Sequence, residues 1–99
     1  MRHTLENQTL TLFLEGELNS YNSEDVEKEI EPIVAAGGFN AIVVDMDALR
    51  YISSAGLRII VRLKQQCDDI TLARVPQGVY DILDMVGFPN LMRIQKRED

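Results

Sequence analysis

Two adjacent serines, Ser53 and Ser54, are the residues of this chain best placed to take part in chemistry. An apolar run with helical spacing follows them, so a helix is predicted to begin at this pair. The first turn of a helix offers unpaired backbone N–H groups and the positive end of the helix dipole, and both stabilise a phosphate. The pair is therefore a candidate phosphorylation switch. The alternative is that one hydroxyl only caps the helix, which is a common role of serine.

Hydrolase chemistry is not expected at these serines, because a serine nucleophile needs a neighbouring base. The segment Ser53-Ser54-Ala55-Gly56 contains only the second half of the nucleophile elbow of hydrolases. The sole histidine, His3, lies near the N-terminus, and Lys64 is about two to three helical turns away from Ser54. We therefore expect a protein that is not an enzyme.

Metal binding is not expected either. Two small groups of carboxylates, Asp45 with Asp47 and Asp68 with Asp69, are of a kind that can hold a magnesium ion. No second cluster completes a coordination shell, so solvated loop acids are the simpler interpretation. The glycines do not reproduce the spacing of a phosphate-binding loop, and no cofactor is expected.

The composition limits the remaining functions. The 99 residues suit one domain, residues 1–99, and the net charge of −6 argues against a nucleic-acid partner, because phosphate contacts need clustered cations. No apolar stretch is long enough to span a bilayer, and the first four residues lack a signal-peptide core. The single cysteine, Cys67, fits a reducing compartment, so a cytoplasmic protein is expected. The absence of a heptad repeat favours a monomer.

The elements that must position the serines are predicted from apolar periodicity. The predicted strands are residues 3–6, 9–14, 41–46, 70–73 and 91–94, and the predicted helices are residues 22–36, 54–67 and 76–86. Asn7-Gln8 is expected to form a hairpin turn, Gly16 to end the second strand, and residues 17–21 to form a loop. Pro32 is expected to kink or divide the first helix.

Each helix is expected to bury one apolar face. The first would bury Val26, Ile30, Ile33 and Val34, the second a stripe of Leu57, Ile60, Val61 and Lys64 with Ile59 and Leu63 beside it, and the third Val79, Ile82, Leu83 and Val86. The continuously apolar segment 41–46 predicts a central strand covered on both faces. The element order indicates a single layered α/β domain, in which three helices pack on a mixed, mostly parallel sheet.

Three segments of the chain resemble the landmarks of the STAS domain family. The run 41–58, which ends in Tyr51-Ile52-Ser53-Ser54-Ala55-Gly56-Leu57-Arg58, resembles the family signature. Residues 14–19 resemble its Gly-Glu-Leu-Asp segment, and residues 79–88 resemble its helix that ends in a Gly-Leu or Gly-Phe turn. The segments follow the family's order over nearly the whole chain. The family comprises bacterial anti-sigma factor antagonists and the cytoplasmic domains of sulphate transporters.

The resemblance implies a partner-switching protein. In this family the unphosphorylated antagonist binds an anti-sigma factor, usually a serine kinase of the GHKL type, and so releases a sigma factor. The kinase phosphorylates a serine at the start of the second helix, which breaks the complex, and a metal-dependent serine phosphatase removes the phosphate. The acceptor position corresponds to Ser54. The aspartate that usually precedes it is Ser53 here, and Ala55 cannot accept a phosphate.

The partner-binding surface implied by the resemblance combines the segment after the second strand with the start of the second helix. Its residues are Glu17, Leu18, Asn19, Ser20, Tyr21, Ser53, Ser54, Ala55, Gly56 and Arg58. Asn19 stands where an aspartate is common in the family. An alternative within the same fold is a subunit that docks on a membrane transporter complex without being phosphorylated, and Ser54 would then be only a cap.

Overall fold

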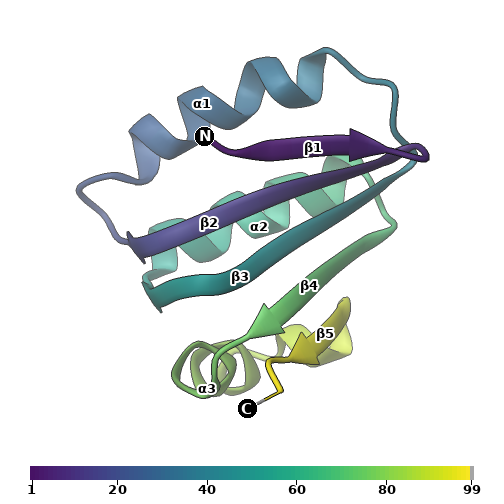
Figure 1. Cartoon of the computed structure of the whole chain (residues 1–99). Helices are drawn as coiled ribbons and strands as arrows, with labels where there is room; N and C mark the ends of the chain where they lie inside the picture. The colour runs from purple at the N-terminus through teal and green to yellow at the C-terminus, as the bar shows by residue number, and fades with distance from the viewer. Residues whose placement is uncertain (99) are drawn as a thin grey trace.

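The computed structural model describes residues 1–98 and confirms the α/β class. Its elements are β1 (His3–Glu6), β2 (Thr9–Leu18), α1 (Ser23–Ala35), β3 (Ala41–Ile52), α2 (Ser54–Gln66), β4 (Ile70–Val75), α3 (Gln77–Met85), the 3-10 turn η1 (Phe88–Asn90) and β5 (Arg93–Lys96). The five strands form one sheet in sequence order, with β1 antiparallel to β2 and the other pairs parallel (Figure 1). None of the helices in residues 1–98 is both long and apolar enough to cross a membrane.

The core lies between the sheet and its helices. Figure 1 shows α1 and α2 behind the strands and no helix in front of β1, β2 or β3. Alternate side chains of β2 and β3 are buried, namely Leu10, Leu12, Leu14, Ile42, Val44 and Met46. Burial of one such side chain contributes about 1.5–3 kcal/mol, so this layer is a main source of stability. β3 is central, as predicted, but the helices of the described chain cover only one of its faces, and the expected double cover is wrong.

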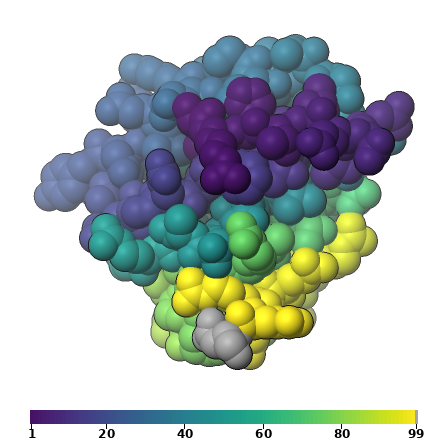
Figure 2. All heavy atoms as spheres, in the orientation of Figure 1, coloured from purple at the N-terminus to yellow at the C-terminus, as the bar shows by residue number. Residues whose placement is uncertain are grey.

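The hairpin between β1 and β2 is confirmed. Asn7 and Gln8 both have left-handed backbones, with φ of 51° and 63°, as a two-residue type I′ turn requires. β1 is one edge of the sheet and β5 is the other. In the space-filling view the N-terminal and C-terminal segments accordingly lie on opposite sides of this face (Figure 2).

β2 and β3 are longer than the sequence pattern predicts. β2 continues through Gly16 to Leu18, and β3 continues from residue 47 to Ile52, so these segments are strand where a loop was expected. The ten residues of β2 lie beside the twelve of β3, and register shifts between Phe13 and Glu15 and between Gly16 and Glu17 take up the difference. Such β-bulges interrupt period-two alternation, which hides this part of β3 in the sequence.

The bulges direct the side chains of two further residues of β3 into the core. Leu49 and Ile52 are three positions apart, yet each is only 1% exposed. A regular strand would point them to opposite faces of the sheet. β3 therefore ends at a buried side chain, Ile52, and α2 begins two residues later, at Ser54.

The first helix needs one correction. α1 runs without interruption through Pro32, so of the two effects predicted for this proline, a kink or a division, the division does not occur. Pro32 lies in the last turn of α1. Proline has no backbone N–H, so one helical hydrogen bond is missing, but little of the helix follows this position. Ile30 is buried as predicted, and Val26, Ile33 and Val34 are partly buried against the core.

The second and third helices need small corrections as well. The buried residues of α2 are Gly56, Ile59, Ile60 and Leu63, whereas Leu57, Val61 and Lys64 lie at the border of the buried stripe. Val79 and Leu83 of α3 are fully buried, but Val86 is 49% exposed because α3 ends at Met85. η1 then occupies residues 88–90, so β5 begins at Arg93 and not at residue 91.

Candidate partner-binding and phosphorylation site

The two serines at the start of α2 have different structural roles. Ser53 is the N-cap, with extended backbone angles, and its hydroxyl accepts a hydrogen bond from the N–H of Gly56 at 3.4 Å. Ser54 is the first helical residue, and its side chain is exposed. The capping role expected for one hydroxyl thus belongs to Ser53, which leaves the Ser54 hydroxyl accessible at the positive end of the helix.

Gly56 lets the start of α2 approach the sheet. A Cβ atom at this position would lie 2.7 Å from Cγ of Leu18 and 2.8 Å from Cγ1 of Ile52, closer than side-chain carbons pack. The N–H of Ser53 also donates to the carbonyl of Leu18 at 2.8 Å. The helix start is therefore held against the ends of β2 and β3, and Ser54 lies beside the turn that follows β2.

That turn, residues 19–22, is braced by two asparagines. Oδ1 of Asn19 accepts from the N–H groups of Tyr21 at 2.9 Å and Asn22 at 3.1 Å. Asn22 returns the contact, because its Oδ1 accepts from the N–H of Asn19 at 2.9 Å and its Nδ2 donates to the carbonyl of Glu17 at 2.7 Å. The turn is thus fixed by its own side chains, a role for Asn19 that the sequence pattern did not reveal.

The residues predicted to contact a partner divide into an exposed set and a supporting set. Glu17, Ser20, Tyr21, Ser54 and Arg58 are exposed, and Asn19, Ser53 and Ala55 are half-buried. Leu18, at 2% exposure, and Gly56 are buried beneath them, so they position the surface and offer no side chain to a partner. Within the described residues, Arg58 has no hydrogen bond or ion pair, and it lies one helical turn after Ser54.

Comparison with models of protein families identifies the family of this chain. The model of the family described as STAS domain matches residues 3–99. The chain belongs to the STAS domain family.

One curated relative and two solved structures illustrate the likeness. A Bordetella bronchiseptica protein named as a candidate anti-sigma factor antagonist, BtrV, is 32% identical over 85 residues, which cover 82% of this chain and 72% of the relative. A candidate anti-sigma factor antagonist from Thermotoga maritima superposes with a TM-score of 0.86 at 18% identity, over 96% of this chain and 85% of that one. The anti-sigma factor antagonist SpoIIAA, in its unphosphorylated form, gives 0.74 at 18% identity, over 94% and 87%. At these identities the two structures show a shared fold.

Charge is distributed unevenly over this STAS domain. Residues 1–36 contain eight acidic and two basic side chains, whereas residues 37–99 contain eight of each. Glu17 before the braced turn and Glu24 and Asp25 after it are all exposed. The turn therefore presents a negative surface, and Arg58 is the nearby cation on α2.

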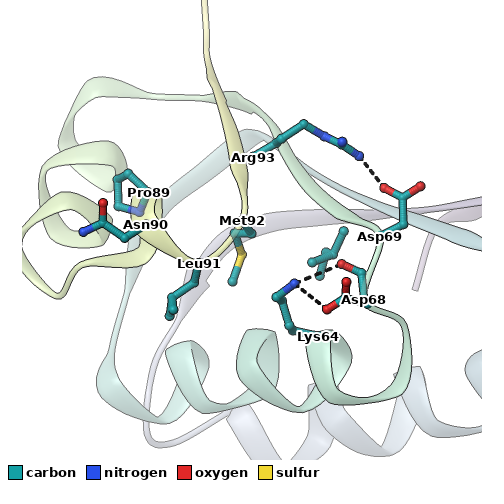
Figure 3. Close-up of a pocket in the computed structure, with 9 residues that line it drawn as sticks. Lys64, Asp68, Asp69, Pro89, Asn90, Leu91, Met92 and Arg93 are labelled. Atoms are coloured by element: carbon teal, nitrogen blue, oxygen red, sulfur yellow. Dashed lines mark hydrogen bonds and ion pairs between the residues drawn. The ribbon is translucent and has the colours of Figure 1, made fainter.

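A hollow of about 530 Å³ lies away from the serines, between the end of α2 and the start of β5 (Figure 3). Its charged residues pair with each other: Lys64 donates to Oδ1 of Asp68 at 2.9 Å, and Arg93 pairs with Asp69. The hydrogen bond from Lys64 and its positive charge lower the pKa of Asp68. Asp68 and Asp69 thus face cations of the same STAS domain.

The other acidic pair, Asp45 and Asp47, lies at the first bulge of β3. Oδ1 of Asp45 accepts from the N–H of Asp47 at 3.0 Å, and Oδ2 accepts from Nε of Arg74 at 2.8 Å. This hydrogen bond and the charge of Asp45 raise the pKa of Arg74. Arg74 has a left-handed backbone with φ of 51°, and Arg97 donates to the carbonyl of Asp47 at 3.0 Å. The sequence pattern did not single out either arginine.

Proposed function

We propose that this STAS domain is an anti-sigma factor antagonist controlled by phosphorylation of Ser54. The observation that carries the proposal is the exposed Ser54 hydroxyl at the first position of α2, beside a braced and exposed turn. The unphosphorylated protein would bind an anti-sigma factor of the GHKL serine kinase type through this surface and so release a sigma factor. It performs no reaction itself and is a monomer when free, acting in the cytoplasm as one domain.

The fold can accommodate a phosphate at Ser54 with little change. The added group carries nearly two negative charges and three acceptor oxygens. The N-terminal end of α2 and the guanidinium of Arg58, one turn away, together stabilise it by about 1 kcal/mol. Ser54 is exposed, so the phosphate displaces no core side chain. Phosphorylation therefore changes the surface and leaves the core intact.

An interface cannot accommodate the same phosphate. A kinase that modifies Ser54 must bring the phosphates of its nucleotide to this hydroxyl. A phosphate already attached to Ser54 would be repelled by the negative charge of that nucleotide. Burying it without a partner also costs several kcal/mol, which corresponds to a loss of affinity of at least about a hundredfold. The complex would then dissociate, and a metal-dependent serine phosphatase would restore the binding form.

The test is a kinase assay with the GHKL-type anti-sigma factor from the same organism and ATP, followed by location of the phosphate by mass spectrometry. We expect modification at Ser54, none in Ser54→Ala, and retained modification in Ser53→Ala, which removes the neighbouring hydroxyl. Ser54→Asp should bind the kinase at least tenfold more weakly and keep the same melting temperature. Equal modification of Ser54→Ala would refute the acceptor assignment.

The alternative function makes a different prediction in the same assay. A subunit that docks on a transporter complex would be neither phosphorylated nor bound by the kinase. Binding of wild-type protein and Ser54→Asp to a transporter ATPase with equal affinity would favour that alternative.

A further inference from the structure

We infer that Tyr21 is the aromatic anchor of the partner interface and inserts into an apolar recess that is bordered by basic residues on the anti-sigma factor. The inference rests on the proposed function and adds the residue that supplies affinity, as distinct from Ser54, which switches affinity off. Tyr21 is 94% exposed, against 45% for Tyr51, which pairs with Glu17 at the end of β2.

Exposure alone does not identify a contact residue, because single exposed apolar side chains are common. What distinguishes Tyr21 is the backbone that carries it. Its N–H is bound by Asn19, and Asn19 and Asn22 brace each other across the turn. Four hydrogen bonds between side chains and backbone thus order a segment that holds an unburied aromatic ring.

Rigid presentation of this kind lowers the entropy lost on binding. A tyrosine has two rotatable side-chain bonds and a large apolar area, and tyrosines on ordered backbones are frequent interface hot spots. Figures 1 and 2 show the turn after β2 protruding from the side of the molecule, so a partner can surround it without meeting the sheet. The protruding ring therefore suits a recess in the partner and not a flat contact.

The position of the turn ties this anchor to the switch. The carbonyl of Leu18 accepts from the N–H of Ser53 at 2.8 Å, so the base of the turn and the start of α2 are directly joined. A partner that surrounds Tyr21 is therefore brought close to the start of α2, where Ser54 is exposed. The proposed affinity residue and the proposed modifiable residue then belong to the same region of the surface.

Charge defines the rim of the partner recess. Glu17, Glu24 and Asp25 flank the turn and are exposed, and the part of the chain that contains them, residues 1–36, carries the whole net charge. Lysine or arginine side chains around the recess would complement these acids. An apolar recess with a basic rim is therefore the chemistry expected of the partner.

The test measures binding of the GHKL-type anti-sigma factor to Tyr21→Ala, Tyr21→Phe and wild type by calorimetry. We expect at least a tenfold loss of affinity for Tyr21→Ala and less than a threefold loss for Tyr21→Phe, which keeps the ring. Met85→Ala is the matched control, because Met85 is also large and 84% exposed but lies at the end of α3, and it should bind like wild type. Melting temperatures should not change, since neither side chain is buried.

Kinetics of Ser54 phosphorylation give a second measure. Because Tyr21 would bind the partner equally in the ground and transition states, Tyr21→Ala should raise KM at least tenfold and leave kcat unchanged. Wild-type affinity for Tyr21→Ala, or an equal loss for Tyr21→Phe, would overturn the anchor. Ser54→Asp in the same titration separates the two proposals: if it abolishes binding while Tyr21→Ala does not weaken it, the anchor fails and the switch stands, and if Ser54→Asp binds normally, the proposed function fails.

Discussion

Gly56 sets how close the start of α2, with the proposed phosphorylation site Ser54, lies to the core. Two opposing effects act on a substitution at this position: alanine is the better helix former by about 1 kcal/mol, but its Cβ would overlap Leu18 and Ile52. Overpacking of a well-packed site costs about 1–3 kcal/mol, and the overlap involves buried side chains that cannot move into solvent. The steric effect should therefore prevail.

We accordingly expect Gly56→Ala to lower the free energy of unfolding by about 1–2 kcal/mol, measured by urea denaturation. Gly78→Ala is the matched control, because Gly78 is also helical but a Cβ atom there would have no neighbouring atom within 4 Å. That variant should gain about 0.5–1 kcal/mol from helix propensity. A Gly56→Ala protein as stable as Gly78→Ala would contradict the close approach of α2 to the strands.

The division of roles between the serines gives a second prediction at this scale. Ser53→Ala removes the N-cap and should cost about 0.5–1 kcal/mol, at the lower end of the usual range because the capping bond is long at 3.4 Å. Ser54→Ala removes an exposed hydroxyl and should leave the unfolding free energy within about 0.3 kcal/mol of wild type. Urea denaturation of both variants measures these differences. If Ser54 were the N-cap in place of Ser53, Ser54→Ala would be the less stable of the two variants.

Among the secondary-structure elements, the position of the proposed phosphorylation site depends on the bulges between β2 and β3. Pairing of β3 with β4 ends at Asp45 and Ala73, and β3 continues beside β2 alone. Asp45 fixes the bulge by accepting from Asp47 and is itself held by Arg74. Arg74 has a left-handed backbone conformation, which glycine would adopt without strain. An arginine at this position therefore carries a conformational cost.

Substitutions of Arg74 separate backbone strain from the ion pair. Arg74→Gly and Arg74→Ala both remove the guanidinium, but only glycine relieves the backbone at φ of 51°. We expect Arg74→Gly to be more stable than Arg74→Ala by about 1 kcal/mol in thermal or urea unfolding. Amide exchange of residues 47–52 should be faster in both variants, because the bulge has lost the cation that holds Asp45. Unchanged exchange there would show that the bulge needs no support from β4.

Over the molecule as a whole, charge distinguishes the N-terminal third of the chain from the rest. The N-terminal part through α1 carries the net charge of −6, and residues 37–99 are balanced. The acidic part includes the braced turn, so an approaching basic partner would be attracted toward the proposed partner-binding surface. Self-association through that surface is opposed by like charge.

This asymmetry predicts a strong salt dependence of partner association. Raising NaCl from about 50 mM to about 500 mM should slow association with the anti-sigma factor by about tenfold and change dissociation little, because screening weakens long-range attraction more than close contacts. Stopped-flow measurements at both salt concentrations test this. The double variant Glu24→Gln, Asp25→Asn should be slower at low salt and equal to wild type at high salt. Association rates independent of salt would contradict electrostatic guidance.

Local sequence patterns were enough to predict the helices and strands, their order along the chain and the candidate phosphorylation site, because these depend on neighbouring residues. Alternation in residues 9–14, helical spacing after Ser54 and the hairpin at Asn7-Gln8 each express preferences of neighbouring residues. The length of β3 and the inward direction of Leu49 and Ile52 could not be predicted in this way. They depend on bulges, and a bulge exists only relative to the strand beside it.

Three features became visible only in the folded chain: which serine caps α2, which predicted contact residues are buried, and which side chains hold the bulge. Leu18 and Gly56 lie close in space although 38 positions separate them along the chain, and their contact depends on where β2 ends. The pairing of Asp45 with Arg74 likewise joins two strands through a strained backbone that no local preference predicts. Such contacts arise from packing between distant segments, and the preferences of neighbouring residues along the chain do not specify them.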